Sequence, residues 1–143
     1  MYTKLVSSAL FLSLSLIFTQ QVYALHKKLK PEKCPSVSSI QSVGVNSAEG
    51  SGGMWDAFQK KANYDTTDEW SFFIGVFSAS DADDALNQAR NSLTTLTFTD
   101  GPHQLPVPGG WICMYQDNAT HLAVAGTPPM SVNAVKHALR LPS

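Results

Sequence analysis

The sequence predicts an α+β domain in which an antiparallel sheet of about five strands carries two helices, with one disulfide bond. The first observation is a segment at residues 68–78 that is apolar on both faces, as in a central strand covered on two sides. The second is a pair of helical segments, which begin at Ser80 and Ser131 and each carry one apolar stripe. The third is that Cys34 and Cys113 are the only cysteines in the chain.

The first residues have the pattern of a signal peptide. Lys4 precedes an apolar run at residues 5–18, and Val22 and Ala24 are small residues at the positions that a signal peptidase reads. We therefore expect cleavage after Ala24. An uncleaved anchor is the alternative, but the run is shorter than the ~20 apolar residues that a spanning helix needs.

These boundaries give the expected organisation of the chain: a signal peptide at residues 1–24, a basic N-terminal tail at residues 25–33 and a single α+β domain at residues 34–143. Such a protein is exported to the periplasm, the cell surface or the medium. In an oxidising compartment Cys34 and Cys113 are expected to form a disulfide bond, with two free thiols as the alternative. The bond would fasten the start of the domain to a late strand.

The charge balance excludes nucleic acid as a partner. The formal net charge is −1 at pH 7, so the chain has no basic face that could displace counterions from a phosphate backbone. The tail at residues 25–33 is the local exception, because basic side chains such as Lys27, Lys28 and Lys30 crowd together there. This cluster is either a solvated tail or a patch for anionic ligands.

The remaining elements follow in chain order. Residues 38–48 suit an exposed or edge strand, because Ile40, Val43 and Val45 are mixed with serines. A flexible turn at residues 49–53 leads to a strand at residues 54–64, for which a helix is the alternative. Residues 97–110 contain repeated glycines and prolines, so we expect a long surface loop there.

The last strands are expected at residues 111–116 and 120–126, joined by a hairpin turn. If the loop has an even number of residues, His121 lies with Ile112 and Met114 on the face away from the core. The expected core face then carries Trp111, Cys113, Tyr115, Leu122 and Val124.

The chain contains no catalytic signature. It lacks the Gly-x-Ser-x-Gly element of serine hydrolases, the His-Glu-x-x-His zinc motif and a Cys-x-x-Cys pair. Asp81, Asp83 and Asp84 begin a helical segment, where acidic residues complement the helix dipole. We therefore expect a protein that is not an enzyme and that has no metal site of its own.

The leader and four short segments carry a resemblance. These segments lie at residues 53–55, 70–72, 111–115 and 127–129. The chain resembles a family of short exported bacterial proteins of unknown function, and in length and order of segments it is similar to a hemin-binding member of that family. The resemblance implies non-catalytic binding of haem for iron acquisition.

Haem needs an axial ligand, an apolar slot and basic groups for its propionates. His121 is the first candidate ligand, because it lies on a regular strand on the face away from the cystine, and His103 in the long loop is the second. Lys27, Lys28 and Lys30 could meet the propionates. The full set of candidate haem-binding residues is His121, Tyr115, Met114, His103 and Trp111.

Two alternatives stay open. His121 could be a partly buried sheet histidine that binds no ligand. The whole domain could instead be a secreted protein-binding or inhibitory module that acts at the cell envelope or on a host partner, through its sheet face and proline-rich loop.

Overall fold

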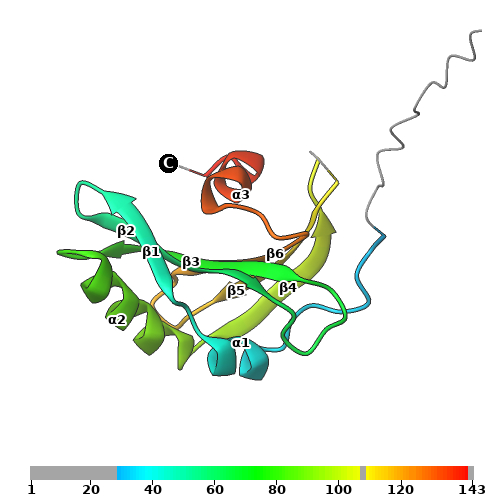
Figure 1. Ribbon diagram of the computed structural model, residues 1–143, viewed down its shortest axis with the longest axis horizontal. Coiled ribbons are helices and arrows are strands. Elements are labelled where there is room, and N and C mark those ends of the chain that lie inside the picture. The colour runs from blue at the N-terminus through cyan, green and yellow to red at the C-terminus, as the bar shows by residue number, and fades with distance from the viewer. Residues whose placement is uncertain (1–28, 107–108, 142–143) are drawn as a thin grey trace, which may run out of the picture.

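The computed structural model describes residues 29–106 and 109–141. Its strands form one antiparallel sheet in the order β1-β2-β3-β6-β5-β4. Helices α1 and α2 lie on one face of the sheet and α3 lies on the other (Figure 1). The elements are α1 (Val37–Val43), β1 (Ser47–Ser51), β2 (Met54–Ala62), β3 (Trp70–Ser78), α2 (Ala82–Leu93), β4 (Thr97–Gln104), β5 (Trp111–Gln116), β6 (Leu122–Thr127) and α3 (Val132–Leu139).

The α+β class with an antiparallel sheet is confirmed, but the described residues contain six strands and three helices where the sequence predicts about five and two. No helix within the described ranges is long and apolar enough to cross a membrane. The expected cleavage after Ala24 and the basic residues Lys27 and Lys28 lie outside these ranges.

Strand β3 is the centre of the sheet, as the sequence predicts. It pairs with β2 along one edge and with β6 along the other. Trp70, Phe72 and Ile74 belong to the cluster on the α1 and α2 side, whereas Phe73 belongs to the cluster beneath α3. Burial on both faces explains why the sequence of this strand is apolar without alternation.

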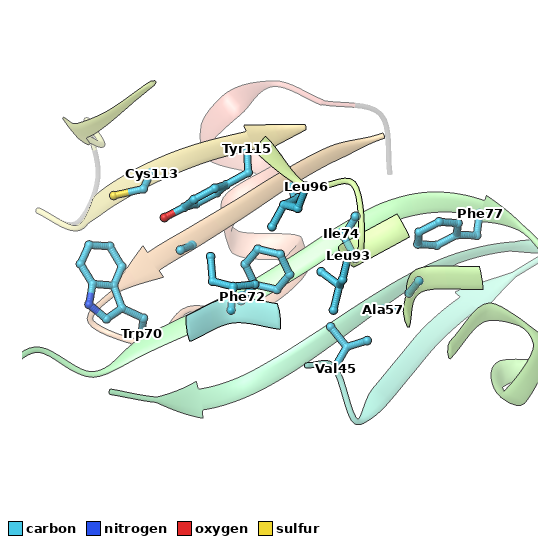
Figure 2. Packing of buried hydrophobic residues seen from close by; sticks show 14 residues of the cluster. Val45, Ala57, Trp70, Phe72, Ile74, Phe77, Leu93, Leu96, Cys113 and Tyr115 are labelled. Atoms are coloured by element: carbon cyan, nitrogen blue, oxygen red, sulfur yellow. The ribbon is translucent and has the colours of Figure 1, made fainter. Parts of the chain in front are cut away.

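The sheet separates two hydrophobic clusters. The larger one lies on the face that carries α1 and α2, where Ile40 and Leu93 pack with Trp70, Phe72 and Tyr115. Figure 2 shows Trp70, Phe72 and Tyr115 among the side chains of this cluster, with Cys113 near one end of it. The smaller cluster lies beneath α3 and contains Phe73, Leu105, Ile112, Val124, Val132 and Val135.

The strand expected at residues 38–48 is wrong, because residues 37–43 form α1 and β1 begins at Ser47. The Ser36 hydroxyl caps this helix by accepting a hydrogen bond from the N–H of Ser39 at 3.2 Å, and Gly44 ends it with a φ of 72°. Ile40 is fully buried against the sheet. The caps at Ser36 and Gly44 and the burial of Ile40 against the sheet therefore outweigh the β propensity of this segment.

The loop expected at residues 97–110 is wrong over most of its length, because Thr97–Gln104 forms β4 at the edge of the sheet. An edge strand tolerates Pro102, since the missing N–H can face away from the neighbouring strand. Gly101 has a φ of 130°, and a Cβ there would lie 2.9 Å from the Cα of Cys113. Glycine and proline thus make this strand irregular without preventing its pairing with β5.

The starts of α2 and α3 lie close to the predicted ones. Asp81 rather than Ser80 caps α2, because its side chain accepts a hydrogen bond from the N–H of Asp84 at 2.9 Å. Ser80 instead donates its N–H to the carboxylate of Asp84 at 3.0 Å. Ser131 caps α3 as expected, by accepting from the N–H of Ala134.

The predicted disulfide bond is confirmed. Cys34 and Cys113 are bonded across a sequence separation of 79, and Cys113 is fully buried. Beside it the hydroxyl of Tyr115 donates to the carbonyl oxygen of Pro35 at 2.6 Å. One covalent bond and one hydrogen bond therefore fix the start of the domain to β5.

Asp65 provides a further link to the start of the domain. Its carboxylate accepts hydrogen bonds from the N–H of Ser36 at 2.8 Å and from the ammonium of Lys33 at 2.9 Å. These hydrogen bonds lower the pKa of Asp65 to about 2, and the one from Ser36 has a larger effect than the one from Lys33. The turn between β2 and β3 is thereby joined to the segment that precedes α1.

Replacing both Cys34 and Cys113 by alanine is expected to lower the free energy of unfolding by about 4.5 kcal/mol, because the chain-entropy model gives this value for a loop of about 80 residues. Urea denaturation followed by tryptophan fluorescence measures the loss. The unmutated protein in the presence of a reductant should behave like the double variant. A loss below about 1 kcal/mol would show that the bond does not restrict the unfolded chain.

Asp65→Asn is expected to flatten the acid branch of the stability curve. Because the pKa of Asp65 is lower in the folded chain, its contribution is complete above about pH 4 and is lost as the pH falls towards about 2. The midpoint temperature of thermal unfolding should therefore fall less steeply in the variant as the pH is lowered between these values. Asp83→Asn is the charge-matched control. Parallel curves for the variant and the unmutated protein would contradict this role.

Candidate functional site

The hairpin between β5 and β6 carries His121, the first candidate from the sequence. Its loop comprises residues 117–121, which is an odd number, whereas the expected faces depend on an even one. Asp117 closes the loop, because its Oδ1 accepts hydrogen bonds from the N–H of Ala119 at 3.0 Å and from the N–H of His121 at 2.7 Å. Thr120 adopts a φ of 67° within it.

The odd loop length reverses the expected faces of β6. Val124 lies opposite Met114 and joins the cluster beneath α3, and Leu122 packs against the same cluster. Ala123 lies opposite Tyr115 in the larger cluster. The expected placement of Leu122 and Val124 on the cystine face is therefore wrong.

His121 is held by two neighbouring side chains. Its Nδ1 lies 2.7 Å from Oδ2 of Asp117, and its ring lies against that of Phe77, with the centroids 4.6 Å apart. Since Phe77 belongs to the larger cluster, His121 lies on the cystine face, and its expected position beside Ile112 and Met114 is wrong. The His121 side chain is 27% exposed, so part of the imidazole is open to solvent.

Asp117 determines which nitrogen of His121 is available. Burial raises the pKa of Asp117, but hydrogen bonds from the side chains of His121 and Ser92 and from the His121 backbone outweigh this effect and lower it. The carboxylate is therefore ionised at neutral pH and can only accept hydrogen bonds. In the neutral imidazole the proton then lies on Nδ1, and Nε2 carries the free lone pair.

Tyr115 lies in the core. It is fully buried, and its ring makes edge contacts with Phe72 and Phe98. Burial raises the pKa of Tyr115, with smaller contributions from the charges of Tyr64 and Asp65, so the phenol stays neutral. Its hydroxyl donates to the Pro35 carbonyl, which leaves Tyr115 away from any surface that a ligand could reach.

The other candidates are dispersed. Met114 is half-buried and packs against the cluster beneath α3. His103 is exposed on β4, with its Nε2 2.8 Å from Oδ2 of Asp100. Trp111 is half-buried at the start of β5. The structure therefore does not bring the five candidate residues into one site.

A second candidate site lies on the α3 face, where the sequence predicts none. A hollow of about 830 Å³ lies between α3 and strands β1 to β3, and one of about 350 Å³ adjoins it near the start of α3. Glu49 and Phe73 line both. The larger hollow has the size of a small-molecule site, and its apolar lining consists of Met54, Phe73, Val76, Leu122 and Leu141.

The larger hollow also contains a buried ion pair. Lys136 on α3 donates to Oδ2 of Asp56 on β2, and both residues are 8% exposed. Oδ1 of Asp56 has no hydrogen-bond partner among the described residues, and a Cβ at Gly75 would lie only 2.3 Å from it. Because a buried polar atom without a partner costs about 1–3 kcal/mol, this oxygen needs an explanation.

The sequence does contain a signal for this ion pair. Lys136 falls on the apolar stripe of α3, four residues after Val132 and next to Val135. Asp56 stands between Trp55 and Ala57 in a strand. A charged residue on a buried face indicates a buried partner of opposite charge, and these two residues have that pattern.

Within residues 29–106 and 109–141, no three histidine, cysteine, aspartate or glutamate side chains are grouped so that they could hold a metal ion. Residues 33–134 match the model of a protein family described as a domain of unknown function, DUF4949. No curated protein and no solved structure matches the chain. A function must therefore be inferred from the residues of this chain.

Lys136→Met is expected to lower the free energy of unfolding by about 3–5 kcal/mol, because it leaves Asp56 buried without its cation. The double variant Asp56→Leu/Lys136→Met should recover most of this loss, since it removes both charges and keeps the volume. Chemical denaturation of the unmutated protein, the Lys136→Met variant and the double variant measures the loss and its recovery. Lys61→Met, which breaks the exposed pair with Glu69, is the control and should cost less than about 1 kcal/mol. Equal losses of stability in Lys136→Met and Lys61→Met would show that the ion pair does not anchor α3.

Proposed function

The chain belongs to the DUF4949 family, and we propose that it is an exported, non-catalytic haem-binding protein in which His121 is the protein ligand of the iron. The resemblance seen in the sequence implies haem as the ligand and iron acquisition as the role. His121 supplies a ligand type that haem iron accepts.

The observation that carries the proposal is the contact between His121 and Asp117. Metal-binding histidines commonly donate the N–H of one ring nitrogen to a carboxylate, which fixes the ring and makes the other nitrogen more basic. Nδ1 of His121 lies 2.7 Å from Asp117, whose side chain is only 1% exposed. Nε2 is thus the nitrogen that would bind the iron, on a ring that Phe77 supports from one side.

The other histidines in the described ranges are less well held. His103 is 53% exposed, and its partner Asp100 is 65% exposed. His137 lies on the exposed side of α3. Neither has a buried carboxylate to orient the ring, so His121 remains the first choice.

The geometry limits which of the remaining candidates could serve the same haem. Trp111 pairs with Thr127 at one end of β6, whereas His121 precedes the other end. The two ends are five residue steps apart along β5, from Trp111 to Gln116, and at about 3.4 Å per step this is a separation of about 17 Å. Met114 packs on the opposite face, so it cannot bind the same iron. We therefore propose that His121 is the one residue among these candidates that would hold the iron.

A second candidate function is a secreted protein-binding or inhibitory module. Strand β1 favours it, because this strand is largely exposed and forms one edge of the sheet. An exposed edge can accept an extended segment of another protein as an additional strand. This function predicts no response to haem.

Titration of the purified protein with hemin is expected to give a saturable change in the Soret band at one equivalent. His121→Ala should weaken binding by about tenfold or more, and free imidazole should restore the Soret band of this variant by taking the place of the lost side chain. Asp117→Asn should weaken binding less and leave the position of the band unchanged, because Asp117 positions His121 without touching the iron.

His137→Ala is the matched control, since it removes an exposed histidine from the other face of the sheet. Unchanged affinity in His121→Ala would disprove the ligand assignment, and His103→Ala then tests the second candidate. If the unmutated protein gives no Soret change, haem binding itself is wrong and the protein-binding module is favoured.

A further inference from the structure

We propose that the larger hollow beside α3 binds an apolar small molecule that ends in a primary ammonium group, with Asp56 and Glu49 as the anionic partners of that group. This hollow lies on the opposite face of the sheet from His121. The proposal is therefore independent of haem binding, and either can fail without the other.

The apolar part of the ligand is inferred from the walls of the hollow. Met54 is 53% exposed and Val76 is 38% exposed, which is unusual for large apolar side chains of a sheet. Both line the hollow together with Phe73 and Leu122. A ligand that covers these side chains would remove apolar surface from water, which is the main source of affinity in such sites.

The cationic end is inferred from the charge balance. The charged side chains that line the larger hollow are Glu49, Asp56 and Lys136. Glu49 lies directly opposite Asp56 in the pairing of β1 with β2, and Lys136 already neutralises Asp56. One negative charge remains, so the hollow attracts a cation and repels a carboxylate.

The unpartnered oxygen of Asp56 identifies the hydrogen-bonding group. Oδ1 lacks a donor within the described part of the chain, and Lys136 donates to Oδ2. An ammonium group brings three N–H donors, which can serve Oδ1 of Asp56 and the carboxylate of Glu49 together. The χ2 torsion of aspartate is broad. A rotation about it can turn Oδ1 towards the hollow when the ammonium group of the flexible Lys136 side chain moves together with Oδ2.

Gly75 makes this arrangement possible. A Cβ at this position would lie 2.3 Å from Oδ1 and 3.3 Å from the Cα of Asp56. Any other residue would therefore push the Asp56 carboxylate away from β3. Gly75 itself lines the hollow, which keeps the backbone of β3 close to the proposed ammonium site.

The test compares n-decylammonium with decanoate, which has a similar apolar chain and the opposite charge. Isothermal titration calorimetry below the micelle concentration of each probe should show one equivalent of decylammonium bound, and decanoate bound at least about tenfold more weakly. Amide NMR signals of Gly75 and Asn133, both of which line the hollow, should shift during the titration with decylammonium.

Glu49→Gln is the decisive variant, because Glu49 is exposed and its replacement leaves the buried ion pair intact. It should weaken decylammonium binding about three- to tenfold and should reduce the preference over decanoate. Asp83→Asn, on α2 across the sheet, removes the same charge at a distance and should change neither affinity.

Three results would overturn the proposal. The first is equal affinity for the two probes, and the second is a preference that Glu49→Gln leaves unchanged. The third is a dimer, seen by analytical ultracentrifugation, whose formation shifts the amides of Gly75 and Asn133. That dimer would assign the hollow to a second copy of the chain.

Discussion

Burial of β3 on both faces is the constraint on which the rest of the structure depends. A strand with Trp70, Phe72 and Phe73 cannot leave either face to water, so helices must cover both sides of the sheet. Helix α2 follows β3 directly and covers one side, and α3 returns from β6 to cover the other. The cystine and the helix caps adjust this three-layer arrangement but do not create it.

Much of the fold could be predicted from the sequence because its strongest patterns report burial. The two-sided apolar pattern of β3, the apolar stripes of α2 and α3 and the pairing of Cys34 with Cys113 are all confirmed. The failures at α1 and β4 have a common physical origin. Local propensity favoured a strand around Ile40 and a loop around Pro102, whereas the caps of a short helix and the tolerance of an edge strand decided the outcome.

The candidate site was harder to predict, because it depends on parity and on long-range contacts. The expected faces depended on a loop with an even number of residues, whereas the loop at residues 117–121 has five, and this change of parity places His121 on the other face of the sheet. The contact with Asp117 lies within that loop, so the sequence contains both partners, but only the backbone conformation brings them together. Asp56 and Lys136 are 80 residues apart, and only their unusual positions on apolar faces indicated a connection.

The placement of β6 between β3 and β5 has a consequence for the order in which the chain can fold. β2 and β3 are neighbours in sequence and can pair early, but the second edge of β3 pairs with residues 122–126, so that Ser71 meets Gly126. Contacts of this sequence separation raise the contact order and slow folding, because a long loop must close before they form. During synthesis, which starts at the N-terminus, one edge of β3 therefore stays unpaired until β6 has been made. Over that interval the nascent chain is at its most vulnerable to pairing with other chains.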